Sequence, residues 1–131
     1  RAARRGLGVS FFQLDLLEGP LPDDFDVLTC SLFLHHLDEP DAVQLLRQMA
    51  ASARRRVLVS DLVRSPTGYA LAWVGCRVLS RSWVVHQDGP VSVAGAFTTL
   101  EALELARRAG LEGATICRHW PQRFLLSWSR A

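Results

Sequence analysis

Apolar residues form two dense runs in the first half of the chain, with an amphipathic segment between them. The first run extends from Phe25 to Leu34, and the second extends from Val57 to Val63. Nearly unbroken runs of this kind are typical of parallel strands that are covered on both faces. The pattern therefore predicts two buried strands, of which the first is central in its sheet.

The segment between these runs begins like a helix. Asp38-Glu-Pro-Asp41 supplies a capping acid, a proline in the first turn and further negative charge at the positive end of the helix dipole. Apolar residues then repeat at intervals of three and four, at Ala42, Leu45, Leu46, Met49, Ala50 and Ala53. We expect a helix from about Glu39 to Ala53 with one buried stripe. Strand, helix and strand in this order predict a right-handed crossover and a parallel sheet.

The start of the chain has the composition of a strand followed by a loop. Val9 to Leu14 is rich in strand-forming residues and ends at Asp15. Leu16 to Asp24 contains one glycine and two prolines, which favour turns and loops. We therefore expect a short strand, an acid at its end and an irregular connection to Phe25.

The second half predicts two helices on either side of an irregular connection. Ser65 to Ser82 has helical composition but is apolar on more than one side, so we expect it to lie between the core and another layer. Val84 to Ala96 contains two glycines and a proline and is expected to be irregular. Thr98-Thr-Leu-Glu101 is a capping box, so a further helix is expected to run to about Ala109 and to close at Gly110.

Two short strands end the chain. Ala114 to His119 and Arg123 to Ser129 have strand composition, and Trp120-Pro-Gln122 joins them. A connection of this length predicts an antiparallel hairpin.

Composition limits the possible size and partners of the molecule. The chain has 131 residues, of which 49% are apolar, and this suits one packed domain or part of one. The net charge of +2 is close to balance, and basic clusters occur at Arg1 to Arg5 and Arg54 to Arg56. Both clusters flank apolar segments, so they are typical of solvated helix ends, with a nucleic-acid surface as the alternative. We expect no nucleic-acid partner.

Cysteine usage and hydropathy indicate the compartment. Cys30, Cys76 and Cys117 lie far apart and have no spacing that suggests zinc or a disulfide framework, so a reducing, cytoplasmic compartment is expected. The longest apolar stretch, from Tyr69 to Leu79, is shorter than the roughly 20 residues of a membrane span and contains Arg77. The sequence predicts neither a membrane span nor a secretory signal.

The order of these elements carries a family resemblance. The run Phe25-Asp-Val-Leu-Thr-Cys-Ser-Leu-Phe-Leu-His-His-Leu37 precedes the first helix, and Val57-Leu-Val-Ser-Asp61 follows that helix. Ala106-Arg-Arg-Ala-Gly-Leu111 stands before the closing hairpin. Taken in this order, the motifs resemble class I S-adenosylmethionine-dependent methyltransferases that act on small molecules. The resemblance covers essentially the whole chain.

The resemblance implies an α/β fold with a Rossmann-like, mostly parallel sheet and a C-terminal antiparallel hairpin. The family strands lie in the order three, two, one, four, five, seven, six, and the hairpin would supply the sixth and seventh. The first two family strands and the glycine-rich turn are not in this sequence. Residues 1–131 are therefore expected to form a partial methyltransferase domain. Without that turn, this chain alone should bind the cofactor poorly and be inactive.

The resemblance also implies S-adenosylmethionine as the cofactor and assigns residues to it. Asp15 would bond the adenine amino group, and Leu16 would line the same pocket. The strand end at Cys30, Ser31 and Leu32 would lie along the methionine part. Such a site is physically sensible because ligands of open parallel sheets bind beyond the carboxyl ends of the strands. The alternative for Asp15 is an acid that only initiates a turn.

His35 and Asp61 are the candidate catalytic residues. Each follows one of the two central strands, so both should reach the same sheet edge and approach one another. The resemblance to sugar and natural-product O-methyltransferases implies a base at His35 and an orienting partner at Asp61. The alternative is that His35 and His36 only satisfy backbone carbonyls. The spacing of His35, His36 and Asp38 fits no tetrahedral metal site, so no metal is expected.

The expected reaction is methyl transfer to a small-molecule acceptor. O-methylation of an aromatic or an alcohol is favoured by the tryptophan-rich second half of the chain. A nicotinamide oxidoreductase is a first alternative, but the closing hairpin and the absence of a Tyr-x-x-x-Lys pair argue against it. The second alternative is a non-catalytic interaction module with a degenerate methyltransferase fold.

The absent family strands predict an open edge beside the strand that begins at Phe25. Unpaired backbone groups and a bare apolar face are costly and prone to association. We therefore expect either that the Val9 to Leu14 strand moves beside Phe25 to Ser31, or that a second chain covers this edge by self-association. In both cases Asp15 would no longer sit where adenine would be.

Overall fold

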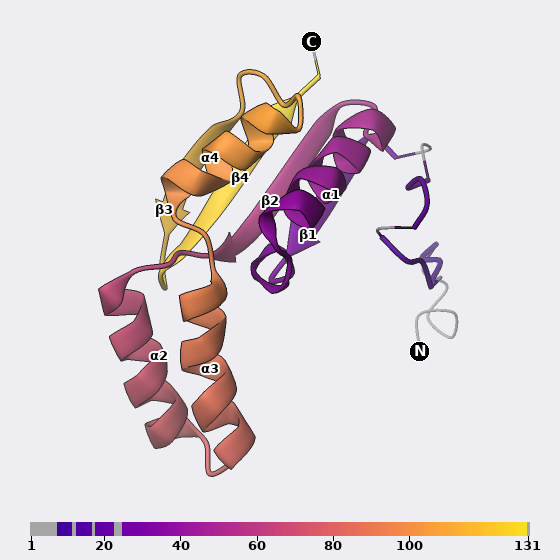
Figure 1. Cartoon of the computed structure of the whole chain (residues 1–131). Helices are drawn as coiled ribbons and strands as arrows, with labels where there is room; N and C mark the ends of the chain where they lie inside the picture. Colours follow the sequence, from indigo (N-terminus) through magenta and orange to yellow (C-terminus); the bar gives the residue numbers. More distant parts are fainter. Residues whose placement is uncertain (1–7, 12, 17, 23–24, 131) are drawn as a thin grey trace.

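The computed structural model describes residues 8–11, 13–16, 18–22 and 25–130, and these form a mixed sheet with two helices on one face and a separate pair of helices (Figure 1). The elements in chain order are β1 (Val27–Ser31), the 3₁₀ turn η2 (Leu34–His36), α1 (Glu39–Ser52), β2 (Arg56–Leu62), α2 (Pro66–Leu79), α3 (Trp83–Gly95), α4 (Thr99–Arg108), β3 (Thr115–His119) and β4 (Arg123–Ser129). The sheet order is β1-β2-β4-β3.

The expected unit of strand, helix and parallel strand is confirmed. β1 pairs with β2 in parallel, from Val27 opposite Arg56 to Ser31 opposite Ser60, and α1 joins them. Asp38 caps α1, because its side chain accepts a hydrogen bond of 3.0 Å from the backbone N–H of Asp41. Capping and the apolar stripe therefore fix the position of this helix, as the sequence predicts.

The closing hairpin is also confirmed, and it completes the expected sheet order. β3 and β4 are antiparallel, and β4 lies beside β2, where it is again antiparallel. Gln122 turns the chain into β4 with a positive φ of 57°. The observed order is the one that the fourth, fifth, seventh and sixth family strands take, so the chain has the expected α/β, Rossmann-like architecture in partial form.

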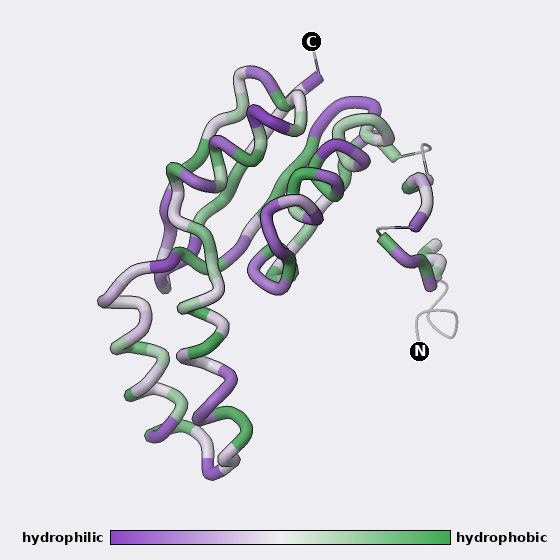
Figure 2. Tube along the Cα trace, viewed as in Figure 1, coloured by the Kyte–Doolittle hydropathy of each residue, from purple (hydrophilic) through white to green (hydrophobic). Residues whose placement is uncertain are grey.

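The core lies between the sheet and the two helices that cover one of its faces. α1 and α4 lie side by side on this face (Figure 1), and apolar colouring follows β2 and β4 beneath them (Figure 2). Side chains from four elements are almost completely buried there, namely Leu45, Leu46, Val57, Val59, Leu105, Phe124 and Leu126. The capping box of α4 is present, with Thr98 and Glu101 each bonding the other's backbone N–H. This packing fixes the position of the carboxyl ends of β1 and β2 relative to one another.

The expected strand at the start of the chain is wrong. The described residues of Val9 to Leu14 lie in no strand, and Phe12 lies outside the described residues. The side chains of Val9 and Phe11 are exposed, so this short segment gains no buried face that would favour strand pairing. Consequently it does not move beside β1, and within the described chain β1 has a strand partner on one side only. Covering of that edge by a second chain stays a prediction.

The first central strand is shorter than the apolar run that predicts it. β1 ends at Ser31, and Leu32 has a positive φ of 52°. The chain then enters the turn η2, in which Leu34 is buried. The apolar character of Phe33 and Leu34 therefore reflects packing against the core and not continued strand pairing.

The expected irregular connection after α2 is wrong, because Trp83–Gly95 forms the helix α3. Gly89 lies where α3 approaches Cys76 of α2, and Pro90 lies inside the helix and is buried. α2 and α3 pack against each other and extend away from the sheet (Figure 1). The expectation that the α2 segment lies between the core and another layer is wrong, because α2 packs mainly against α3. Many of its large apolar side chains are exposed, among them Tyr69, Leu71, Trp73, Val74, Val78 and Leu79.

In the part of the chain that the structure describes, no helix combines the length and the apolar character needed to cross a bilayer.

The close approach of α2 and α3 predicts a specific effect of a small substitution. A Cβ atom at Gly89 would lie 2.3 Å from the Sγ atom of Cys76, so Gly89→Ala should lower the free energy of unfolding by about 1–3 kcal/mol. Gly75→Ala is the matched control, because no atom lies within 4 Å of a Cβ there and alanine favours a helix.

Urea unfolding followed by circular dichroism measures both effects. Cys76→Ala should restore stability to the Gly89→Ala chain, since it removes the sulfur atom that blocks the new methyl group. Equal stability of Gly89→Ala and the original chain, or no rescue by Cys76→Ala, would contradict the observed packing.

Candidate functional site

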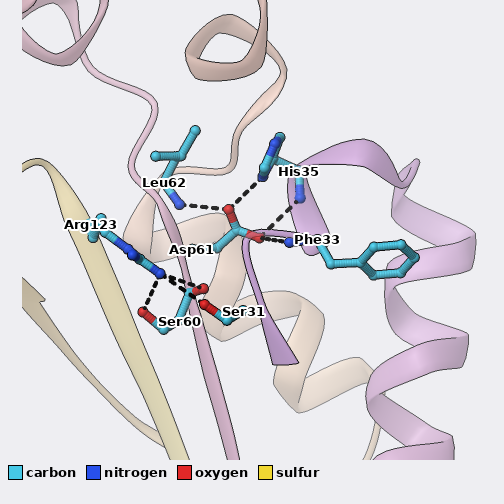
Figure 3. Close-up of polar contacts among 7 residues, drawn as sticks. All are labelled: Ser31, Phe33, His35, Ser60, Asp61, Leu62 and Arg123. Atoms are coloured by element: carbon cyan, nitrogen blue, oxygen red, sulfur yellow. Dashed lines mark hydrogen bonds and ion pairs between the residues drawn. The ribbon is translucent and has the colours of Figure 1, made fainter. Parts of the chain in front are cut away.

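A buried carboxylate at the end of β2 organises the carboxyl edge of the sheet (Figure 3). Asp61 is 1% exposed. Its Oδ2 atom accepts the backbone N–H groups of Phe33 at 3.1 Å and His35 at 3.2 Å. Its Oδ1 atom accepts the N–H of Leu62 and lies 2.6 Å from Nδ1 of His35. Three of the four contacts are backbone N–H groups that donate to the carboxylate oxygens.

The turn η2 exists in this position because Asp61 supplies its hydrogen-bond acceptors. After Leu32 the chain leaves the β1 ladder, so the N–H groups of Phe33 and His35 lose their strand partners. Buried backbone donors need a replacement acceptor, and the carboxylate of Asp61 provides one. The side chain of Asp61, which lies in β2, therefore determines the path that the chain takes after β1.

This arrangement fixes the ring of His35. An ionised carboxylate can only accept, so Nδ1 donates to Asp61, and the tautomer that this selects carries its lone pair on Nε2. The His35 side chain is 6% exposed, and the His36 ring lies against it with a centroid separation of 4.0 Å. His36 itself is exposed. The expected approach of His35 to Asp61 is confirmed, while their catalytic roles stay predictions.

The structure brings together two of the five candidate cofactor residues. Leu16 and Cys30 line the same hollow of about 270 Å³, whose other lining residues are Leu21, Leu28, Thr29, Phe33, Leu45 and Met49. Asp15 is exposed in the loop just before Leu16. Ser31 and Leu32 lie at the end of β1 and are exposed, outside the lining of this hollow. Mainly apolar side chains therefore enclose the space beside the carboxyl half of β1.

The thiol of Cys30 has an unusual acidity for a physical reason. Burial raises its pKa to about 11, and the negative charge of Asp61 adds to the effect. Cys30 is therefore a neutral thiol near neutral pH. Such a group behaves as a small apolar residue in the wall of the hollow.

Sequence reasoning missed two polar residues at this edge, Ser60 and Arg123. Nη2 of Arg123 donates to Oγ of Ser60 at 2.9 Å, to the carbonyl oxygen of Ser60 at 3.3 Å and to Oγ of Ser31 at 3.1 Å (Figure 3). Ser60 and Arg123 stand far apart in sequence, so spacing gives no sign of the contact. Only the placement of β4 beside β2 could have indicated it.

Comparison with known proteins adds sequence relatives. The chain is 31% identical over 84 residues to a ubiquinone biosynthesis O-methyltransferase of Aeromonas salmonicida. The aligned region covers 61% of this chain and 34% of the relative. The chain is 36% identical over 78 residues to the protein with the same name from Methylococcus capsulatus, covering 58% of this chain and 33% of the relative. The chain thus matches about a third of the length of these curated relatives. No family model matches the sequence.

Solved structures share the architecture over nearly the whole chain. The methyltransferase SibL in its apo form matches with a TM-score of 0.71 at 18% identity, covering 98% of this chain and 38% of that protein. The pyocyanin biosynthetic protein PhzM matches with a TM-score of 0.66 at 24% identity, covering 99% and 37%. PigF, solved with SAH, matches with a TM-score of 0.62 at 16% identity, covering 88% and 34%.

The strand order, the antiparallel hairpin and these structural similarities all indicate the same fold. Each of the three solved proteins is larger than this chain and matches it over a little more than a third of its own length. The chain therefore has the class I S-adenosylmethionine-dependent methyltransferase fold, of which it contains a part.

Proposed function

We propose that the protein to which this chain belongs transfers the methyl group of S-adenosylmethionine to an oxygen atom of a small aromatic or alcohol acceptor. The observation that carries the proposal is the buried Asp61 carboxylate, which fixes the ring of His35 at the carboxyl edge of the sheet. The sequence relatives, which are named ubiquinone O-methyltransferases, support transfer to oxygen.

Binding of the cofactor is proposed for the hollow beside β1. Its lining is apolar apart from Thr29 and the neutral thiol of Cys30, which suits an uncharged aromatic ring such as adenine. Leu16 and Cys30 would contact that ring, and Asp15 would reach its amino group from the adjoining loop. Ser31 and Leu32, at the end of β1, would lie along the methionine part. This chain alone, without a glycine-rich turn, is expected to bind weakly.

The proposed chemistry uses His35 as a base and Asp61 as its orienting partner. When bound, the cofactor supplies an electrophilic methyl group on a positively charged sulfur. Nε2 of His35 would take the proton of the acceptor hydroxyl as the oxygen bonds the methyl carbon and the bond from that carbon to the cofactor sulfur breaks, which would leave S-adenosylhomocysteine as a neutral thioether. Asp61 would stabilise the imidazolium that results, because its carboxylate accepts the hydrogen bond from Nδ1–H throughout. Positioning of the two reactants supplies much of the remaining rate enhancement.

A non-catalytic interaction module is the second candidate function. The observation that favours it is the 6% exposure of the His35 side chain, which leaves little access to its ring. In that case the contact between His35 and Asp61 only secures the turn η2. The two candidates differ in whether loss of the His35 ring changes the rate of methyl transfer.

Replacing His35 tests the proposed base directly. In the intact protein, His35→Ala should lower turnover by about 10²-fold and leave cofactor affinity nearly unchanged, because the ring removes a proton and does not contact the cofactor. Radiolabelled methyl transfer and calorimetric cofactor binding measure the two quantities. His86→Ala is the control, because Nε2 of His86 bonds the carbonyl of Ser80 within the α2 and α3 pair. Equal turnover of the original protein and His35→Ala would leave His35 with a structural role only.

The acidity of Cys30 gives a second test, independent of turnover. Because its pKa is about 11, its thiolate is scarce at about pH 8, and alkylation should be far slower than at the exposed Cys117. Asp61→Asn removes a nearby negative charge and should speed the labelling of Cys30, although burial should keep it slower than Cys117.

Time-resolved alkylation followed by peptide mass spectrometry measures these rates. If Cys30 contacts the cofactor, S-adenosylhomocysteine added to the intact protein should slow its labelling further and leave Cys117 unaffected. Unchanged labelling of Cys30 at saturating S-adenosylhomocysteine would remove Cys30 from the proposed cofactor site.

A further inference from the structure

Arg123 reaches across two strands from the first position of β4. Its backbone pairs with Leu62 at the end of β2, and its Nη2 atom bonds the hydroxyl of Ser31 at the end of β1. The same nitrogen bonds both the hydroxyl and the carbonyl oxygen of Ser60. One side chain therefore links β4, β2 and β1 at their common edge (Figure 3).

Two features of the Arg123 side chain are energetically unfavourable. Within the described chain, no carboxylate pairs with Arg123, and its buried Nε atom has no hydrogen-bond partner. A buried donor without an acceptor is unfavourable, and a cation held only by hydroxyls and a carbonyl gains less than one held by a carboxylate. An apolar side chain at this position would avoid both penalties. It would also lose the hydrogen bonds to Ser31 and Ser60, which only the guanidinium group of the partly buried Arg123 can donate.

Arg123 bonds two serines that precede the residues of the His35 and Asp61 contact in the sequence. Ser60 precedes Asp61 in β2, and Ser31 is followed by Leu32 and then by the turn that carries His35. Ser31 and Ser60 are also partners in the register of the parallel pair. The carbonyl oxygen of Ser60 accepts a hydrogen bond of 3.0 Å from the N–H of Leu32, just after β1. The same oxygen also accepts a hydrogen bond from Nη2 of Arg123.

β1 leaves its pairing with β2 directly after Ser31, at the point where the site begins. Ser31 and Ser60 are the last partners in the register of the two strands, and Leu32 has a positive φ of 52°. The ends of strands open more easily than their middles. The 2.6 Å contact between His35 and Asp61 depends on the separation of β1 and β2 at this point. A third strand that bonds both ends would keep that separation constant.

We propose that Arg123 is a positioning residue, which clamps the ends of β1 and β2 so that Asp61 holds the His35 ring in its reactive orientation. The proposal rests on the proposed function only for its effect on turnover, because the clamp itself is a property of the fold. Arginine suits this task better than lysine, since its planar group is extended and presents several donors in a fixed geometry.

Substitution of Arg123 in the intact protein tests the clamp. Arg123→Met should lower kcat by about tenfold and leave the KM values for cofactor and acceptor within about twofold, because ring orientation affects the reacting state more than binding. Arg123→Lys should recover part of the loss. Arg118→Met is the matched control, since Arg118 lies on the same hairpin but bonds Gln122 and not the strand ends.

A spectroscopic measurement separates positioning from a merely structural role. The proton between Nδ1 of His35 and Asp61 should give a resolved downfield NMR signal, assigned by its loss in His35→Gln. Arg123→Met should broaden or abolish this signal, while Arg118→Met keeps it. Should Arg123→Met fail to fold, Ser60→Ala removes one clamp acceptor and should lower kcat about threefold and broaden the same signal.

A double variant tests whether Ser60 and Arg123 act through the same contact. Ser60→Ala combined with Arg123→Met should cost little more than Arg123→Met alone, because both remove the same contact. An unchanged signal and unchanged kcat in Arg123→Met, or fully additive losses in the double variant, would overturn the clamp. If the original protein transfers no methyl group and the signal still depends on Arg123, the clamp stands and the proposed function fails.

Discussion

The hydrogen bonding of one buried carboxylate determines the arrangement of the candidate site. Asp61 is almost fully removed from solvent, so its oxygens must find donors within the chain. It finds them in the backbone of η2 and in the ring of His35. The turn after β1 and the orientation of His35 follow from this one placement, and the charge of Asp61 adds to the effect of burial that raises the pKa of Cys30. Loss of both oxygens, as in Asp61→Ala, would therefore affect local folding and the proposed chemistry together.

Local signals in the sequence predict much of the fold. The acids and proline at the start of α1, the capping box at Thr98 and the apolar runs of β1 and β2 each place an element close to its observed bounds. The pairing of His35 with Asp61 is predictable as well, because parallel strands end at the same sheet edge. These features depend on short-range patterns that a single sequence contains.

Other features depend on contacts between distant segments and could not be predicted in this way. The Val9 to Leu14 segment has strand composition but no strand partner among the described residues, so composition alone misleads. Gly89 lies within α3, where the close approach of α2 favours a small residue, so this glycine does not mark a loop. Arg123 reaches Ser31 only because β4 inserts beside β2, and no sequence spacing indicates this.

We predict that the Asp61 carboxylate accelerates the chemical step of the proposed methyl transfer. This step is measured as the single-turnover rate of Asp61→Asn in the intact protein at saturating S-adenosylmethionine, with cofactor affinity measured alongside. The expected rate is at least about 10²-fold below that of the original protein, with a cofactor Kd that changes little. Equal single-turnover rates, in a variant that folds and binds the cofactor normally, would show that Asp61 plays no part in the chemical step.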